Sequence, residues 1–277
     1  MSDAGSRLAV LGSPISHSKS PAIQRAAYGV LGLDWTYEAI EMTGDGLGDF
    51  VAGLDDQWRG LSLTMPLKRD VLALLAWRHP LVDLVGGANT VLLGTEGPRG
   101  FNTDVQGVVE SFASVGVSSL GYVHLLGAGA TAASVLVAVA QLGATRVLVS
   151  ARSPERALGI VELGGRLGVD VVVRPWGIMD RSMIVPDAVV STVPGGQNDL
   201  VFAEPIRAGS VLFDVAYDPW PSRLASDWMS AGGTVISGLD LLVNQAVGQV
   251  RLFVAGDQFA PLPNELDVVA AMRAAVA

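Results

Sequence analysis

The chain has 277 residues, a net charge of −9 at neutral pH and a mean hydropathy of +0.43, so it is globular and long enough for two domains. The acidic balance disfavours nucleic-acid binding, and the absence of cysteine excludes disulfides, thiolate metal sites and a cysteine nucleophile. No apolar run is long enough to span a bilayer, and the three histidines have no metal-ligand spacing. We expect a cytoplasmic monomer or homodimer that binds small molecules, with no metal, membrane or nucleic-acid partner.

Short β-like runs alternate with helical patterns through most of the chain, which predicts an α/β protein with mainly parallel sheets. A first strand is expected at RLAVL (7–11). A helix should begin at Pro21 and end at Gly32, because apolar residues recur with the spacing of one helical face. There follow expected strands at 34–42 and 60–66, a helix at 47–54 between them, a hairpin at 89–104 and a helix at 105–116.

A second αβ pattern begins at residue 121. It reads as a strand, a glycine turn, an apolar helix and another strand, and ends near residue 153. Further strands are expected at 187–192, 210–217 and 233–237, and the last helix at 239–256. The chain therefore divides into a first domain of roughly a hundred residues and a nucleotide-sized domain after it.

The glycine turn VHLLGAGATAAS places Gly127, Gly129 and Ala132 in a G-x-G-x-x-A pattern between an apolar strand and a helix. The first glycine suits a tight turn, the second lets a pyrophosphate approach the backbone, and the helix N-terminus faces the anion. Glycines also end strands for purely structural reasons. The strand that follows ends about 20 residues on, where a ribose contact belongs, and this favours a dinucleotide site.

The next strand ends in SARSPER, with no acid to bind a ribose 2′-hydroxyl, as an NAD site would have. Arg152 is placed to meet a 2′-phosphate, with Ser150 and Ser153 near it, and a planar guanidinium suits that dianion. The alternative is that Arg152 belongs to a solvated helix start. We predict NADP as the cofactor.

Five other segments are richer in polar side chains than turns require. Together they offer hydroxyls, amides, an amine and a carboxylate, the groups that would surround a polyol carboxylate. The segments are GSPISHSKSP (12–21), LSLTMPLK (61–68), GGANT (86–90), GFNTD (100–104) and GLDLLVNQA (238–246).

With these segments the sequence resembles the shikimate dehydrogenase family. The family pattern runs G-x-P-x-x-H-S-x-S-P, T-x-P-x-K, A-N-T, N-T-D, a glycine-rich turn, S-T-x-P, D-x-x-Y-x-P and G-x-x-x-L-x-x-Q-A. All eight pieces occur here in order, beginning at residues 12, 64, 88, 102, 127, 191, 214 and 238, so the resemblance covers essentially the whole chain.

The resemblance implies an NADP-dependent oxidoreductase that reversibly reduces 3-dehydroshikimate to shikimate, in chorismate and aromatic amino-acid biosynthesis. It implies an α/β substrate-binding domain with a mainly parallel sheet, formed by residues 1–104 and 239–277. Residues 105–238 would form a Rossmann-like NADP-binding domain, with a cleft between the two.

The resemblance also implies the site residues. Lys68 and Asp104 look like the catalytic pair, and which of them accepts the proton stays open because a coupled pair titrates as a unit. The implied substrate-binding residues are Ser16, Ser18, Thr64, Asn89, Thr103, Tyr217 and Gln245. The two serines and Tyr217 would hold the carboxylate, and Asn89, Thr103 and Gln245 the ring hydroxyls. The implied cofactor-binding residues are Gly127, Ala128, Gly129, Ala130, Ser150, Arg152, Ser153, Thr192, Val215 and Gly238.

Several alternatives stay open. Ser16 and Ser18 could serve turn or capping chemistry, and Lys68 could be a solvated cation. Ser62 stands where the family usually has asparagine, and Gln24 where it often has histidine. The runner-up functions are a quinate or aminoshikimate dehydrogenase of the same family and a non-catalytic NADP-binding sensor. The glycine-rich stretch GGQND (195–199) is a candidate mobile loop near the cofactor.

Overall fold

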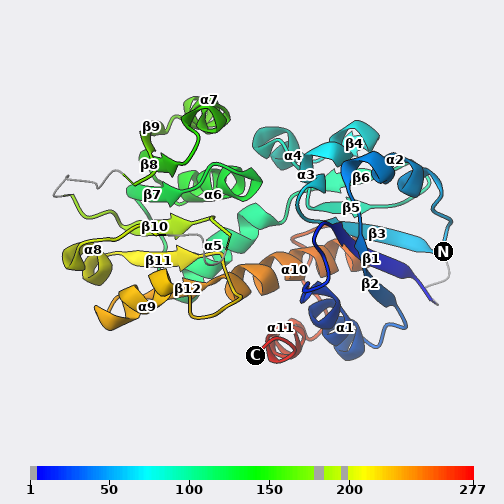
Figure 1. The fold of residues 1–277 in the computed structure, drawn as a ribbon. Helices are drawn as coiled ribbons and strands as arrows, with labels where there is room; N and C mark the ends of the chain where they lie inside the picture. Colours follow the sequence, from blue (N-terminus) through cyan, green and yellow to red (C-terminus); the bar gives the residue numbers. More distant parts are fainter. Residues whose placement is uncertain (1–4, 178–183, 195–198) are drawn as a thin grey trace. The chain divides into compact units, whose positions relative to one another are not determined.

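The computed structural model describes residues 5–177, 184–194 and 199–277, so most of the GGQND stretch lies outside the described residues. The chain forms two compact units, which Figure 1 shows with their elements labelled. The first unit comprises Met1–Thr103 and Leu242–Ala277, and the second comprises Asp104–Leu241. Each is described here by itself.

The first unit holds a mixed sheet with the order β2-β1-β3-β5-β6-β4. Its described strands are β1 (Arg7–Gly12), β2 (Thr36–Glu41), β3 (Trp58–Leu63), β4 (Trp77–Arg78), β5 (Thr90–Leu92) and β6 (Arg99–Phe101). β1 lies parallel to both β2 and β3, whereas β5 runs antiparallel to β3 and β6 and forms the expected hairpin with β6. β1 and β3 are almost completely buried, as central strands should be.

The helices of the first unit are α1 (Ser20–Leu31), α2 (Gly44–Ala52), α3 (Leu67–Asp70), α4 (Pro80–Val85), α10 (Gly238–Ala255) and α11 (Glu265–Ala274), with a 3-10 turn at Val71–Leu74. α10 begins in the second unit and continues into the first. As predicted, α1 has Pro21 in its first turn and ends at Gly32, whose φ of +67° suits glycine. The helix expected to be last is not, because α11 follows it and packs against α1.

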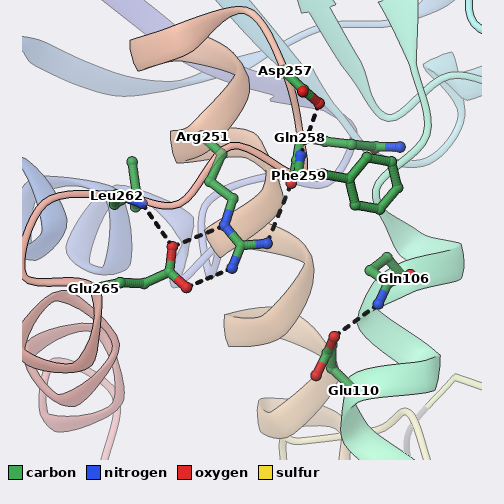
Figure 2. A network of polar contacts seen from close by, with 8 residues as sticks. All are labelled: Gln106, Glu110, Arg251, Asp257, Gln258, Phe259, Leu262 and Glu265. Carbon is green, nitrogen blue, oxygen red and sulfur yellow. Dashed lines mark hydrogen bonds and ion pairs between the residues drawn. The ribbon is translucent and has the colours of Figure 1, made fainter.

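A cluster of polar contacts fixes the connection between α10 and α11 (Figure 2). Arg251 on α10 makes a two-pronged ion pair with Glu265 on α11, with Nε–Oε2 at 2.9 Å and Nη2–Oε1 at 2.5 Å. The Leu262 N–H donates to the same carboxylate at 2.9 Å, and Arg251 also donates to the Gln258 carbonyl at 3.3 Å. The Glu265 carboxylate therefore links α10 to the segment that leads into α11.

The second unit holds a sheet whose described strands are all parallel, in the order β12-β11-β10-β7-β8-β9. The strands are β7 (Tyr122–Leu126), β8 (Arg146–Ala151), β9 (Asp170–Pro175), β10 (Ala188–Ser191), β11 (Val211–Asp214) and β12 (Val235–Ser237). Numbered from β7 as the first strand and read from β9, the order is 3-2-1-4-5-6, that of a dinucleotide-binding Rossmann fold. The expected Rossmann-like fold is therefore confirmed.

The helices of the second unit are α5 (Asp104–Ser114), α6 (Ala130–Gln141), α7 (Leu158–Leu167), α8 (Glu204–Gly209) and α9 (Arg223–Ser230), with a 3-10 turn at Pro154–Ala157. Eight consecutive residues of α6, Ala132–Val139, are buried, which accounts for the most apolar run of the sequence. Across the described residues no helix has the length and apolar character needed to cross a membrane.

Candidate active site

Most of the predicted substrate residues of the first unit lie at one edge of its sheet. β5 runs antiparallel to β3 and β6, so its first residues lie where those strands end. The Leu63 N–H donates to the Asn89 carbonyl at 2.8 Å, and the Asn89 N–H donates to the Phe101 carbonyl at 3.1 Å. On the other side the Thr64 N–H donates to the Leu11 carbonyl at 2.9 Å, so the segments carrying Thr64, Asn89 and Thr103 end side by side.

Asn89, Thr103 and Gln245 meet at this edge, and each is at most 8% exposed. Asn89 Nδ2 donates to Thr103 Oγ1 at 2.9 Å and to Gln245 Oε1 at 3.3 Å, while Asn89 Oδ1 accepts from the Thr103 N–H at 2.9 Å. Gln245 Nε2 donates to the Leu242 carbonyl of its own helix at 2.8 Å. Three residues separated by up to 156 positions along the sequence thus form one hydrogen-bonded cluster.

Gly248 allows α10 to approach this cluster. A Cβ at Gly248 would lie 3.1 Å from Thr103 Cγ2 and 3.2 Å from Thr103 Cβ, tighter than ordinary side-chain contacts. A larger residue would fit only if Thr103 or the helix shifted by a few tenths of an ångström.

The two predicted catalytic residues occupy different units. Lys68 is partly buried on the short helix α3, and its carbonyl accepts from the Ala88 N–H at 2.8 Å, next to Asn89. Asp104 is the first residue of α5 and is 5% exposed. The Asn102 side chain donates to the Gly87 carbonyl at 2.9 Å. This bond holds the short segment between the end of α4 and Asn89.

The serine-rich loop after β1 is held by a residue that the sequence analysis did not identify. Glu41, the last residue of β2, accepts from Ser13 Oγ at 2.5 Å and from the Ile15 N–H at 2.9 Å. Ser16 is exposed, and Ser18 Oγ accepts from the Ser20 N–H at 3.3 Å. The Ser18 hydroxyl therefore has a role in the turn, and as an acceptor in that bond it keeps its own proton for donation.

In the second unit the predicted cofactor residues lie beyond the carboxyl ends of five adjacent parallel strands. Gly127 follows β7, Arg152 follows β8, Thr192 follows β10, Val215 follows β11 and Gly238 follows β12. Ligands of open α/β sheets bind at this edge. The predicted residues are thus collected on the edge where the fold binds ligands.

The glycine turn uses its two glycines for different reasons. Gly127 has a φ of +102°, and a Cβ there would lie 2.5 Å from Thr192 Oγ1, so the turn itself requires glycine. Gly129 precedes α6 with an ordinary φ of −86°, and a Cβ there would meet no atom within 4 Å. Neither backbone nor packing explains glycine at 129, and a ligand approaching the helix N-terminus would. Ala128 and Ala130 complete the turn.

Arg152 lies against an aromatic residue that sequence reasoning missed. Its guanidinium carbon is 5.3 Å from the centre of the Trp176 ring, just beyond the end of β9. Trp176 Nε1 donates to Asp199 Oδ1 at 2.7 Å, and this hydrogen bond is the main reason that the pKa of Asp199 is lowered. Stacking on the indole limits where the guanidinium can lie and keeps Arg152 at the sheet edge.

The serines near Arg152 differ in their surroundings. Ser150 is 4% exposed and its hydroxyl lies 2.9 Å from His124 Nε2, while its carbonyl accepts from the Gly127 N–H at 2.9 Å. Ser150 therefore supports the glycine turn from inside the unit. Ser153 is only partly buried and precedes the 3-10 turn.

Tyr217 and Gly238 follow neighbouring strands of the second unit. A Cβ at Gly238 would lie 2.0 Å from the Val215 carbonyl oxygen, so only glycine permits this approach of the two backbones. Tyr217 is partly buried, and desolvation, with a smaller effect of Asp218, raises its pKa. Asp214 is buried and accepts from Ser222 Oγ at 2.6 Å, which fixes the start of this segment.

Comparison with known proteins gives consistent results. Residues 10–91 match the family model described as the shikimate dehydrogenase substrate binding domain. A curated relative from Methanothrix thermoacetophila, the shikimate dehydrogenase (NADP(+)), is 34% identical over 97% of this chain and 97% of its own.

Solved structures agree over the whole length. Shikimate dehydrogenase from Mycobacterium tuberculosis is 38% identical, covers 97% of this chain and 99% of its own, and superposes with a TM-score of 0.83. Shikimate 5-dehydrogenase from Thermus thermophilus, solved in complex with NADP(H) and shikimate, is 30% identical over 98% of this chain and 99% of its own, with a TM-score of 0.81. With this identity maintained along both chains, the protein belongs to the shikimate dehydrogenase family.

Proposed function

We propose that the protein is an NADP-dependent shikimate dehydrogenase, which interconverts 3-dehydroshikimate and shikimate. The observation that carries the proposal is the buried cluster of Asn89, Thr103 and Gln245, within a unit that matches the family's substrate binding domain. Buried amide and hydroxyl groups at a sheet edge are suited to a small polyol. The relatives named for NADP and shikimate support the same assignment.

The proposed substrate contacts follow from the groups available. Asn89, Thr103 and Gln245 would bind ring hydroxyls, because amides and hydroxyls both donate and accept. Ser16 and Ser18 would donate to the carboxylate, with Tyr217 as a third donor. Burial raises the pKa of Tyr217, so its phenol keeps its proton at neutral pH. Thr64 would add a contact from the end of β3.

The proposed chemistry is a hydride transfer coupled to a proton transfer. Bound NADPH supplies the hydride. Lys68 and Asp104 would act as a coupled pair that holds and moves the proton of the hydroxyl that is made or oxidised. Each is linked to one residue of the substrate cluster. Asp104 directly follows Thr103 in the chain, and the Lys68 carbonyl accepts from the N–H of Ala88, the residue before Asn89.

The proposed cofactor contacts belong to the second unit. The open space at Gly129 and the N-terminus of α6 are suited to the pyrophosphate, and Arg152 to the 2′-phosphate. Thr192, Val215 and Gly238 lie further along the same sheet edge, next to strands β10 to β12, and would contact the rest of the cofactor. A cytoplasmic location and a monomeric or homodimeric state complete the proposal.

The first experiment follows the absorbance at 340 nm with purified protein, shikimate or quinate, and NADP or NAD. Rapid reduction of NADP by shikimate, and little with quinate or NAD, is the expected result. Preference for quinate or NAD would favour the runner-up dehydrogenase. Folded protein that binds NADPH but reduces neither cofactor with either substrate would favour the sensor. Sedimentation in the same buffer would determine the oligomeric state.

A further inference from the structure

A continuous series of buried hydrogen bonds leads to Asn89 from helix α1 and strand β2. At its centre is Gln249 on α10, which is 3% exposed and has no part in the proposed function. Its Oε1 accepts from Gln24 Nε2 at 3.1 Å and from Ser62 Oγ at 3.0 Å. Its Nε2 donates to the Asn89 carbonyl at 3.3 Å and to Thr90 Oγ1 at 3.1 Å. The carboxamide thus uses both of its protons and both acceptor positions.

The backbone determines the direction of every one of these bonds. A carbonyl oxygen only accepts, so the nitrogen of the Gln249 side chain must face Asn89, and its oxygen must face Ser62. Ser62 then donates to Gln249 and accepts from the Tyr37 hydroxyl at 2.7 Å. Burial raises the pKa of Tyr37, so this donor keeps its proton. The single proton of Ser62 is therefore directed into the protein, toward Gln249.

The same reasoning applies on the side of α1. Gln24 is completely buried and directs its nitrogen at Gln249, so its own Oε1 is the acceptor for Tyr28, at 3.0 Å. Desolvation raises the pKa of Tyr28 well above its usual value. Both tyrosines are thus fixed donors, and the polar atoms between them and Gln249 are all satisfied.

On the side of the proposed substrate, the Thr90 hydroxyl links Gln249 to the Asn89 side chain. Thr90 Oγ1 accepts from Gln249, so its own proton goes to Asn89 Oδ1, at 2.8 Å. Asn89 Oδ1 also accepts from the Thr103 N–H, at 2.9 Å. Two donors on this oxygen oblige the Asn89 nitrogen to face Thr103 Oγ1 and Gln245 Oε1. A reversed Asn89 carboxamide would lose both bonds.

We propose that Gln249, acting through Thr90, is a positioning residue that determines which end of the Asn89 carboxamide is offered to the substrate. This inference rests on the proposed function. With the Thr90 proton in place, the N–H donors of Asn89 point to the side where substrate hydroxyls would be bound. Without it, one of the two donors to Asn89 Oδ1 is lost, and only the Thr103 N–H and the Gln245 Oε1 acceptor still oppose a reversal that would present the Asn89 oxygen there.

The test uses shape-conserving variants. Thr90→Val removes the hydroxyl and keeps the side-chain volume, and Gln249→Met keeps the length but has no strong donor or acceptor. We expect the KM for shikimate to rise about 5- to 10-fold in each, the effect of one hydrogen bond. We assume that Asn89 would bind a ring hydroxyl other than the one that is oxidised. In that case kcat should change less than about 2-fold, and the KM for NADP should stay unchanged. Thr90→Ser should restore the wild-type KM.

A structural role for the same residues predicts a different outcome. It would lower the melting temperature of Thr90→Val and leave the KM for shikimate at the wild-type value, and this result would overturn the inference. Ser111→Ala, which removes a buried hydroxyl from α5 that is bonded to the Gly107 carbonyl, serves as the control for a purely structural loss.

A double-mutant cycle with Asn89→Ala makes the test specific. If Thr90 acts through Asn89, then Thr90→Val should not weaken shikimate binding further in the Asn89→Ala protein, as measured by titration calorimetry. Additive losses would contradict the inference. If wild-type protein neither binds nor oxidises shikimate, the proposed function fails and the inference with it. If wild-type protein is active and Thr90→Val has the same KM, the inference alone fails.

Discussion

The two sheet edges that carry the predicted site residues differ in the groups that they offer to a ligand. The edge of the first unit is made of side chains, since Asn89, Thr103 and Gln245 are buried and bonded to one another. The edge of the second unit is made largely of backbone, with Gly129 open to any ligand that approaches the start of α6. One edge offers donors and acceptors in fixed directions, and the other offers unobstructed main chain.

The difference follows from what each edge would bind. A small polyol has hydroxyls that differ only in position, so it must be distinguished by the direction of each hydrogen bond, and directions are held by neighbouring bonds. A pyrophosphate has many equivalent oxygens, and backbone N–H groups at a helix N-terminus suffice if no side chain is in the way. Changes at the first edge should therefore affect substrate and turnover, and changes at the second edge should affect the cofactor.

The most severe test of this comparison is Lys68→Ala. Loss of a group that moves the proton should lower kcat by about 100- to 10,000-fold, while the dissociation constant for NADPH stays within about 2-fold, because no cofactor contact is removed. Steady-state kinetics and NADPH fluorescence titration measure the two quantities. Arg69→Ala changes the exposed neighbouring cation on α3 and should retain full activity. Equal losses of turnover and NADPH affinity would contradict the role of Lys68.

Arg152→Ala tests the other edge. Removing a guanidinium that meets a 2′-phosphate should raise the KM for NADP about 10- to 100-fold, the effect of a charge-assisted hydrogen bond, and leave the KM for NAD unchanged. The KM for shikimate should not change. Arg166→Ala, an exposed cation of α7 in the same unit, provides the matched control. A parallel rise for NADP and NAD would show that Arg152 does not recognise the phosphate.

Paired glycine substitutions separate ligand approach from turn geometry. Gly129→Ala should lower NADPH affinity about 5- to 10-fold with a change of at most about 1 kcal/mol in the free energy of unfolding, because its Cβ meets no protein atom. Gly127→Ala should destabilise the protein by about 1–3 kcal/mol, because its φ is positive and its Cβ would meet Thr192. Chemical denaturation with and without NADPH measures both. Unchanged affinity in folded Gly129→Ala protein would remove the argument for a pyrophosphate at this turn.

The sequence predicted the parts of the fold that depend on local patterns. The structure confirms the expected strands that alternate with helical patterns in both sheets. It also confirms the hairpin of β5 and β6 and the end of α1 at Gly32. The sequence did not predict strands β4 and β9 or the helices α3, α4, α7, α8, α9 and α11. α11 has alanine at three of its ten positions, which weakens the apolar period that would reveal it.

The supporting contacts of the site could not be predicted, because they join residues far apart in sequence. Ser62 and Gln24 stood out only as departures from a family pattern, yet both donate to the same oxygen of Gln249. A single sequence does not show that two such positions share a partner. One signal was available, since Gln245 and Gln249 are four residues apart on an otherwise apolar helix face, and both therefore point to the same side.

The smallest expected effect concerns the Arg251–Glu265 ion pair between α10 and α11. This pair lies outside both sheet edges, so its loss should change stability alone. Arg251 lowers the pKa of Glu265, so the ion pair stabilises the folded protein above the ordinary glutamate pKa, and this contribution is lost as the pH falls through the lowered pKa. Both side chains are partly exposed, so we expect Glu265→Gln to reduce the free energy of unfolding by only about 1 kcal/mol at pH 7. The difference from wild type should shrink below about pH 4.5 and vanish at lower pH, as urea denaturation at several pH values would show. The KM values for shikimate and NADP should both be unaffected. A changed KM for shikimate would mean that the positions of Gln245 and Gln249 depend on the ion pair near the end of their helix. The polar contacts that support the substrate site would then extend as far as α11.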